Sequence, residues 1–132
     1  MPEGTVLFSS RAPIGYIAIA AGEVTTNQGF KSVIPKQEIG TAYVYYFLKQ
    51  NLPVIEGMAS GSTFKEISGS TMKGVPAVIP DANTLSRFND FCVPIFAQQR
   101  ILEEQSQSLT TLRDNLLPKL MSGELDVSDI DL

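Results

Sequence analysis

Three short stretches near the start of the chain are rich in apolar residues. Residues 5–9, 16–20 and 30–34 are rich in β-branched and aromatic side chains, and sequences typical of turns separate them. Residues 75–79 form a further apolar stretch with a proline near each end. A proline cannot donate a backbone hydrogen bond, so we expect this last strand at a sheet edge. The pattern predicts a small sheet of short strands.

The apolar spacing changes to three and four residues after residue 40. Tyr43, Val44, Phe47 and Leu48 follow this helical spacing. It predicts a helix of about ten residues that ends before Pro53, because the position preceding a proline disfavours helical geometry. We expect this helix to cover one face of the sheet.

A helical period also dominates the chain from residue 84. Eight of eleven positions spaced alternately three and four residues apart are apolar. The eleven positions are Leu85, Phe88, Cys92, Ile95, Gln99, Leu102, Ser106, Leu109, Arg113, Leu116 and Leu120. Such a narrow stripe is typical of a coiled-coil seam. A continuous helix over residues 84–117 would span roughly 50 Å at about 1.5 Å per residue. We therefore expect the eight apolar positions to contact a partner helix.

Several residues on this helix modify the prediction. The polar seam positions Gln99, Ser106 and Arg113 either fix the register of a pair or face solvent at a local stutter. Cys92 is most simply a small buried hydrophobe, with a redox role as the alternative. Pro94 predicts a kink. Gly123 follows as the C-terminal cap of a short final turn.

These patterns predict an α+β fold with three regions. Residues 1–82 form a β-rich domain with a covering helix. Residues 83–120 form a long helix of the coiled-coil type, and residues 121–132 form an acidic tail. Removing residues 120–132 leaves ten acidic and ten basic residues, so the tail carries the whole net charge of −4.

Composition excludes several classes of function. There is no histidine, which removes a histidine general base, a histidine-containing triad and a histidine metal ligand. Cys92 is the single cysteine, and no apolar run approaches the ~20 residues of a membrane span or resembles a signal peptide. No dinucleotide or Walker pattern is present. We expect a soluble cytoplasmic protein that is not an enzyme and has neither cofactor nor metal.

A near-repeat supplies one set of candidate binding residues. Residues 61–65 read GSTFK, and residues 69–73 read GSTMK. Backbone amides, hydroxyls and a lysine in this arrangement suit a phosphate, which selects Ser62, Thr63 and Lys65. Turns or helix caps, with Ser68 or Ser70 starting a short helix, are the alternative for both copies. The pattern Ser-x-x-Lys at residues 62–65 also matches acyl-transferring enzymes, but their companion motifs are absent.

A second set of candidates follows the predicted strands. Arg11, Asn27, Gln28 and Lys31 carry groups able to contact DNA bases or phosphates. The alternative is that the asparagine and glutamine satisfy loop backbones. Residues 1–73 carry six bases and five acids, a balance that permits DNA binding without arguing for it.

Four segments, in order, resemble the DNA specificity subunit of type I restriction-modification systems. They are residues 4–16, 27–32, 59–68 and 112–125. The resemblance implies a target recognition domain that reads double-stranded DNA, followed by a spacer helix that pairs antiparallel. It also implies two partners, a methyltransferase subunit that modifies adenine and a restriction subunit, with no catalysis by the specificity subunit itself.

The resemblance also implies that the first part of the recognition domain is missing from this chain. We therefore expect either DNA recognition through the remaining surface, or a module that dimerises or docks the methyltransferase without reading DNA. In isolation, the helix is expected to form an antiparallel homodimer with a second copy.

Overall fold

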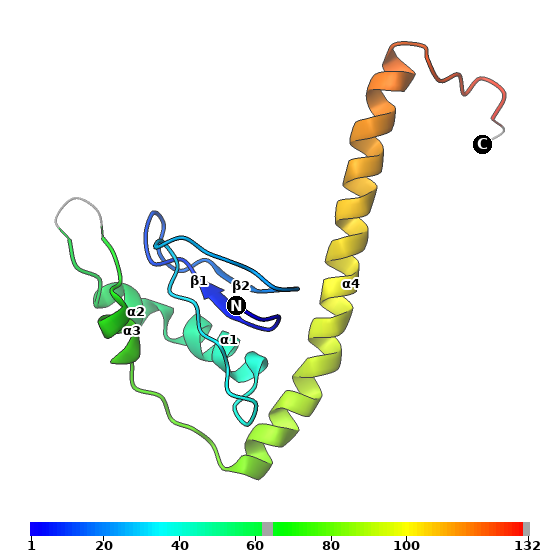
Figure 1. Ribbon diagram of the computed structural model, residues 1–132. Coiled ribbons are helices and arrows are strands. Elements are labelled where there is room, and N and C mark those ends of the chain that lie inside the picture. The colour runs from blue at the N-terminus through cyan, green and yellow to red at the C-terminus, as the bar shows by residue number, and fades with distance from the viewer. Residues whose placement is uncertain (62–64, 131–132) are drawn as a thin grey trace. The chain divides into compact units, whose positions relative to one another are not determined.

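The computed structural model describes residues 1–61 and 65–130. The chain divides into two compact units, Met1–Val93 and Pro94–Leu132. The first unit holds two strands and three short helices, and a long helix begins there and continues into the second unit (Figure 1). In chain order the described elements are β1 (Val6–Phe8), β2 (Ile17–Ile19), α1 (Thr41–Gln50), α2 (Leu52–Gly57), α3 (Gly69–Lys73) and α4 (Ala82–Met121). The α+β fold class predicted from the sequence is confirmed.

The sheet is smaller than predicted. Strands β1 and β2 pair antiparallel, with Val6 opposite Ile19 and Phe8 opposite Ile17. The third predicted strand, at residues 30–34, runs antiparallel along β1 but forms only isolated bridges there. A tight turn precedes this segment, and Pro35 after it has no backbone N–H, so the pairing ends after a few residues.

Helix α1 has the bounds that the apolar spacing predicts, and it packs on both strands. Val44 and Leu48 project from it into the core. The buried residues of this core come from β1, α1, α2 and the segments after α2: Val6, Phe8, Val44, Leu48, Ile55, Ile67 and Val75. Unit Met1–Val93 therefore closes a hydrophobic core with residues of its own.

Two predictions for the segment between α1 and α4 were wrong or incomplete. Helix α2 was not foreseen, although Pro53 lies in its first turn, where a missing N–H costs nothing. The strand expected at residues 75–79 does not form. Its prolines remove two ladder donors, and the carbonyl of Val78 instead accepts a hydrogen bond from the Tyr43 hydroxyl at 2.7 Å.

Helix α4 starts at an aspartate cap. The Asp81 carboxylate accepts hydrogen bonds from the backbone N–H and the hydroxyl of Thr84, at 3.0 and 2.7 Å. These bonds hold the pKa of Asp81 below its ordinary value. The helix runs through Pro94 and ends at Met121, and Gly123 beyond it has a φ of +74°. A left-handed glycine after the last turn confirms the predicted C-terminal cap.

The first turns of α4 are attached to the Met1–Val93 unit. Leu85 and Cys92 are buried there. Between them, the Asn89 side-chain amide donates to the carbonyl of Ile39 at 3.0 Å. Gly40 adopts a φ of +81°, and a Cβ at this position would lie 2.5 Å from the Asn89 amide. The glycine thus leaves the space that Asn89 occupies.

No helix in the described part of the chain combines the length and apolarity needed to cross a membrane.

Candidate nucleic-acid interface

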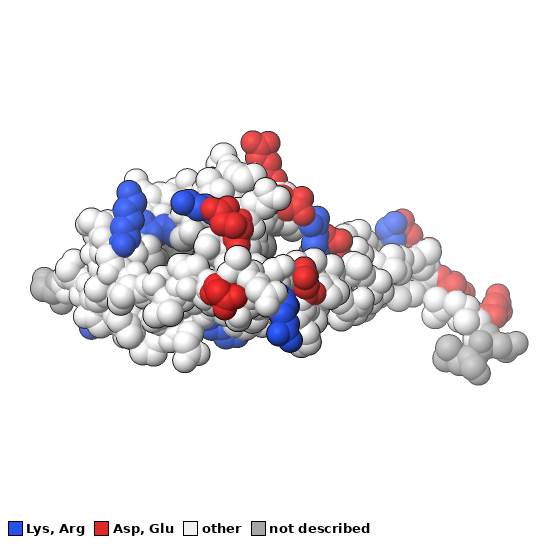
Figure 2. All heavy atoms as spheres, turned by 90° about the horizontal axis from the view of Figure 1, so that it is seen from below, with Lys and Arg blue, Asp and Glu red and all other residues white. Residues whose placement is uncertain are grey.

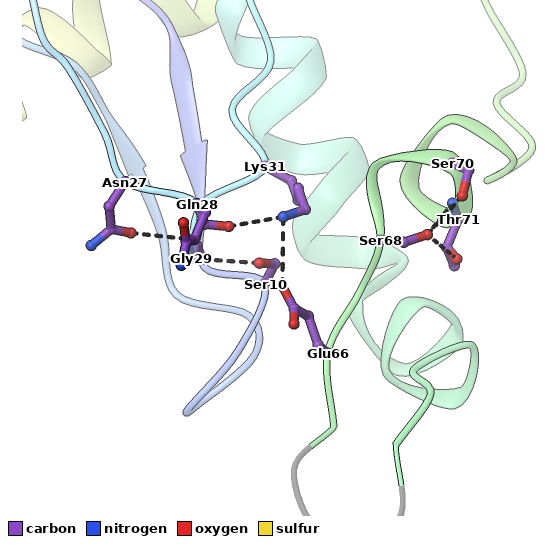
Figure 3. A network of polar contacts seen from close by, with 9 residues as sticks. All are labelled: Ser10, Asn27, Gln28, Gly29, Lys31, Glu66, Ser68, Ser70 and Thr71. Atoms are coloured by element: carbon purple, nitrogen blue, oxygen red, sulfur yellow. Dashed lines mark hydrogen bonds and ion pairs between the residues drawn. The ribbon is translucent and has the colours of Figure 1, made fainter.

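Three segments far apart in the sequence meet at the end of β1. Ser10 donates to the carbonyl of Gly29 from both its backbone N–H, at 2.8 Å, and its hydroxyl, at 3.0 Å. The backbone N–H of Ile67 donates to the Ser10 carbonyl at 3.0 Å, and Arg11 and Glu66 form an antiparallel bridge. The predicted candidates Arg11, Asn27, Gln28, Lys31 and Lys65 are therefore brought into one region of the surface. Figure 3 shows Asn27, Gln28 and Lys31 around Gly29 in this region.

A tight turn centred on Gly29 forms the middle of this region. The carboxamide oxygen of Asn27 accepts from the Gly29 N–H at 2.8 Å, an arrangement typical of an Asx turn. Gly29 is buried, and a Cβ at this position would lie 3.2 Å from the Nε of Arg11. The stem of Arg11 thus lies against the bare backbone of a glycine whose N–H and carbonyl are both hydrogen-bonded.

Lys31 is occupied within the same region. Its ammonium group donates to the carbonyl of Gln28 at 2.9 Å and lies 3.7 Å from a carboxylate oxygen of Glu66 (Figure 3). The ion pair is partly exposed, and pairs of this kind contribute little to stability. The hydrogen bond and the ion pair together keep the Lys31 ammonium group close to its own loop. Asn27 therefore uses its carboxamide oxygen within the loop, as the alternative interpretation of the asparagine anticipates, and Lys31 bonds to the same loop.

Two other basic residues are differently placed. Arg11 and Lys65 are exposed, and neither side chain makes a hydrogen bond or ion pair with any residue in the described ranges 1–61 and 65–130. Both line an open groove of about 700 Å³. Its wall is formed by Arg11, Ala12, Pro13, Ile14, Glu56, Lys65 and Glu66. Hydrogen-bond donors of Arg11 and Lys65 and acceptors of the two glutamates thus line the same groove.

The charge around this groove is mixed. Glu56, from α2, and Glu66 lie among the two basic residues. Interspersed basic and acidic side chains also mark the face of the molecule seen in Figure 2. A surface of mixed charge attracts DNA less strongly than a basic one. Contacts in this groove would therefore contribute more to discrimination between base sequences than to non-specific affinity.

The two halves of the Gly-Ser-Thr repeat have different outcomes. Ser62 and Thr63 lie outside the described residues. In the second copy, the Ser68 hydroxyl accepts from the backbone N–H of Thr71 at 3.0 Å and caps α3 (Figure 3). The helix-cap interpretation is therefore confirmed for the second copy.

Glu66, Glu56 and Gly29 were not among the predicted site residues. The predicted candidates were residues with cationic, amide and hydroxyl side chains, so the acids next to them were not selected. The dipeptide Lys65-Glu66 and the sequence Asn27-Gln28-Gly29 carry a local signal, but only pairing between distant segments reveals that they meet. In the described ranges, His, Cys, Asp and Glu residues form no group of three or more able to hold a metal ion.

The predicted helix seam divides into two parts. Leu85 and Cys92 are buried in the Met1–Val93 unit, and Phe88 packs edge-on against the Tyr46 ring with 6.1 Å between centroids. Burial raises the pKa of the Cys92 thiol. The remaining apolar positions are exposed: Ile95, Leu102, Leu109, Leu116 and Leu120. Their contact with a partner helix stays a prediction.

Comparison with known proteins links these features to one family. Residues 1–117 match the family model of the type I restriction modification DNA specificity domain. The chain is 42% identical over 112 residues to the specificity subunit of the type I restriction enzyme MjaIX of Methanocaldococcus jannaschii, covering 78% of this chain and 26% of that protein. It is 28% identical over 128 residues to the HindI specificity subunit of Haemophilus influenzae, covering 95% of this chain and 28% of that protein. The chain thus spans about a quarter of the length of these relatives.

Proposed function

The chain belongs to the type I restriction modification DNA specificity family, and on this basis we propose that it recognises double-stranded DNA through the groove beside Arg11. In this proposal the chain catalyses nothing. It acts in the cytoplasm and positions a methyltransferase subunit and a restriction subunit on DNA. The relatives are named as specificity subunits of type I restriction enzymes, which supports a recognition role.

The single observation that carries the proposal is the position of Arg11. Arg11 is exposed, its side chain lies against the hydrogen-bonded backbone of Gly29, and its guanidinium has no partner among the described residues. An arginine in this condition offers several donors to a ligand without first breaking an internal bond. Lys65 lines the same groove and offers a point charge suited to phosphate. Ser62 and Thr63 remain candidates for phosphate contact on sequence grounds alone.

Salt-dependent binding of a mixed-sequence duplex tests the proposal. We expect binding at low ionic strength with a dissociation constant that rises steeply with salt. Replacing Lys65 with Ala should weaken binding about equally for all sequences and reduce the salt slope by about one. Lys36→Ala is the matched control, since Lys36 is also exposed but lies in the loop before α1, outside the groove lining. Absence of binding at low salt contradicts the proposal.

A second candidate function rests on the exposed leucines of α4. Leu102 and Leu109 leave 54% and 66% of their surface exposed, and the chain as a whole carries a charge of −4. A module that docks the methyltransferase subunit or dimerises, without reading DNA, would use this apolar stripe and would need no basic surface. Co-purification with a methyltransferase subunit, combined with no salt-dependent DNA binding, would favour this function.

The stripe also supports the proposed antiparallel homodimer. Sedimentation over a range of concentrations up to ~100 μM would detect even micromolar association. A monomer throughout that range contradicts self-pairing of α4. The apolar stripe would then contact a helix of a different protein.

A further inference from the structure

Acidic residues are unusual in a groove that meets DNA, and Glu66 is one of two in this lining. Glu66 lies partly exposed in the groove lining, and its backbone bridges both Ser60 and Arg11. Phosphates repel a carboxylate, so a nearby glutamate weakens non-specific attraction. A glutamate that accepts a hydrogen bond from a base edge can instead add discrimination between bases.

Arg11 and Glu66 are complementary in hydrogen bonding. They are bridge partners from strand-like segments, so their side chains leave the same small patch of backbone, and both line the groove. Arginine donates to the O6 and N7 acceptors of guanine in the major groove, and glutamate accepts from the N4 amino group of cytosine. The two residues therefore present the donor and the acceptor that one G·C base pair requires.

We propose that Arg11 and Glu66 jointly read one G·C base pair, with Gly29 as the positioning residue for Arg11. This inference deepens the DNA-recognition function proposed above and rests on it. Lys31, 3.7 Å from the Glu66 carboxylate, offsets part of the repulsion between that carboxylate and the phosphates. Gly29 supports the arginine because its backbone is fixed by Asn27 and Ser10, and because a Cβ would press on the arginine Nε.

The test is selection of preferred duplexes from a random library, followed by binding measurements on duplexes that differ at one base pair. We expect the wild-type chain to prefer G·C at one position by about tenfold. Glu66→Gln should bind non-specific DNA more tightly, because it removes a negative charge, yet lose most of the preference at that position. Arg11→Ala should lose the preference at the same base pair.

Chemical modification of the DNA isolates the arginine contact. Replacing the guanine by 7-deazaguanine removes the N7 acceptor and should weaken wild-type binding severalfold while leaving Arg11→Ala unchanged. Gly29→Ala should reduce the G·C preference while far-UV circular dichroism stays that of the wild type.

A control variant separates the effect on base preference from the effect of net charge. Glu38→Gln makes the same change of net charge in the loop before α1, outside the groove lining. It should not alter the base preference. If Glu66→Gln tightens binding to all duplexes and preserves their ranking, Glu66 is only an ion-pair partner of Lys31 and the inference is overturned.

Other outcomes are equally decisive. DNA binding without any base preference, or effects of Arg11→Ala and Glu66→Gln at different base pairs, also overturns the inference. Absence of DNA binding by the wild-type chain instead refutes the proposed function on which the inference rests.

Discussion

Unit Met1–Val93 and unit Pro94–Leu132 differ in how far they bury their apolar side chains. In the first, Phe8, Leu48 and Ile55 are almost completely buried by segments of the same unit. In the second, Leu109 and Leu116 remain exposed, and no described residue of 94–130 reaches full burial. Burial of apolar surface is the main driving force of folding, so the first unit can hold itself together. The second has helix propensity and an apolar stripe, which contact with a partner helix would bury.

Phe8→Ala should have the largest effect on this difference. Phe8 is completely buried between the sheet and α1, and truncation of such a residue costs about 3–5 kcal/mol. This is comparable to the whole stability of a small domain. Urea titration followed by circular dichroism should show loss of the cooperative transition, and DNA binding should disappear with it. A midpoint close to that of the wild type would show that the first unit does not depend on its core.

Gly40→Ala should have the next largest effect. The φ of +81° disfavours any residue with a Cβ, and the added atom would meet the Asn89 amide at 2.5 Å. We expect a loss of about 2 kcal/mol in the free energy of unfolding, measured by urea titration.

Gly57→Ala is the matched control for Gly40→Ala. Gly57 lies in α2, and a Cβ there would have nothing within 4 Å. Alanine is the better helix former, so this variant should be as stable as the wild type or slightly more stable. Equal losses in both variants would contradict the close fit between Gly40 and Asn89.

Asp81→Ala should give a smaller, pH-dependent effect. Hydrogen bonds from Thr84 lower the pKa of Asp81, so its contribution to stability is present above the ordinary value of 3.8 and is lost as the pH falls through the lowered folded-state value. At neutral pH the variant should melt a few degrees below the wild type, and the difference should vanish in strong acid. Asp90→Ala, at an exposed position within α4, is the matched control for loss of an aspartate from this part of the chain.

Leu109→Ala should have the smallest effect on the unfolding of the isolated monomer. The side chain is 66% exposed, and changes at such positions usually stay within about 0.5 kcal/mol. If α4 pairs with a partner helix, the same variant should raise the dissociation constant of the complex several-fold. Sedimentation and thermal melting of one sample distinguish these effects. A large loss of monomer stability would show that Leu109 packs within its own chain.

Sequence reasoning succeeded where structure depends on neighbouring residues. The spacing of Val44 and Leu48 predicted α1, and the long helical period together with Gly123 predicted α4 and its end. It failed at residues 75–79, where composition suggested a strand but the prolines removed ladder donors. It also missed α2, because Pro53 was taken as the end of a helix and not as the start of another.

The structure brings the candidates Arg11, Asn27 and Lys31 into one region, and their contact with DNA stays a prediction. Asn27 and Lys31 bond to their own loop, whereas the Arg11 side chain has no bond to the described residues. The bonds of Asn27 and Lys31 stay within one loop and are local. The position of Glu66 beside Arg11 and Lys31 depends instead on pairing between distant segments, which no local pattern reveals.

The sequence by itself determined the helical periods, the turn and cap residues, the absence of histidine and the family, because each depends on local spacing or residue identity. Only the tertiary structure decided which polar groups remain available and which apolar residues are covered. The bonds between Ser10 and Gly29 and the bridge between Arg11 and Glu66 left the arginine side chain without a partner among the described residues and placed an acid next to it. The seam was likewise divided between buried Cys92 and exposed Leu109. Both results follow from contacts between distant segments, and residue order alone does not specify those contacts.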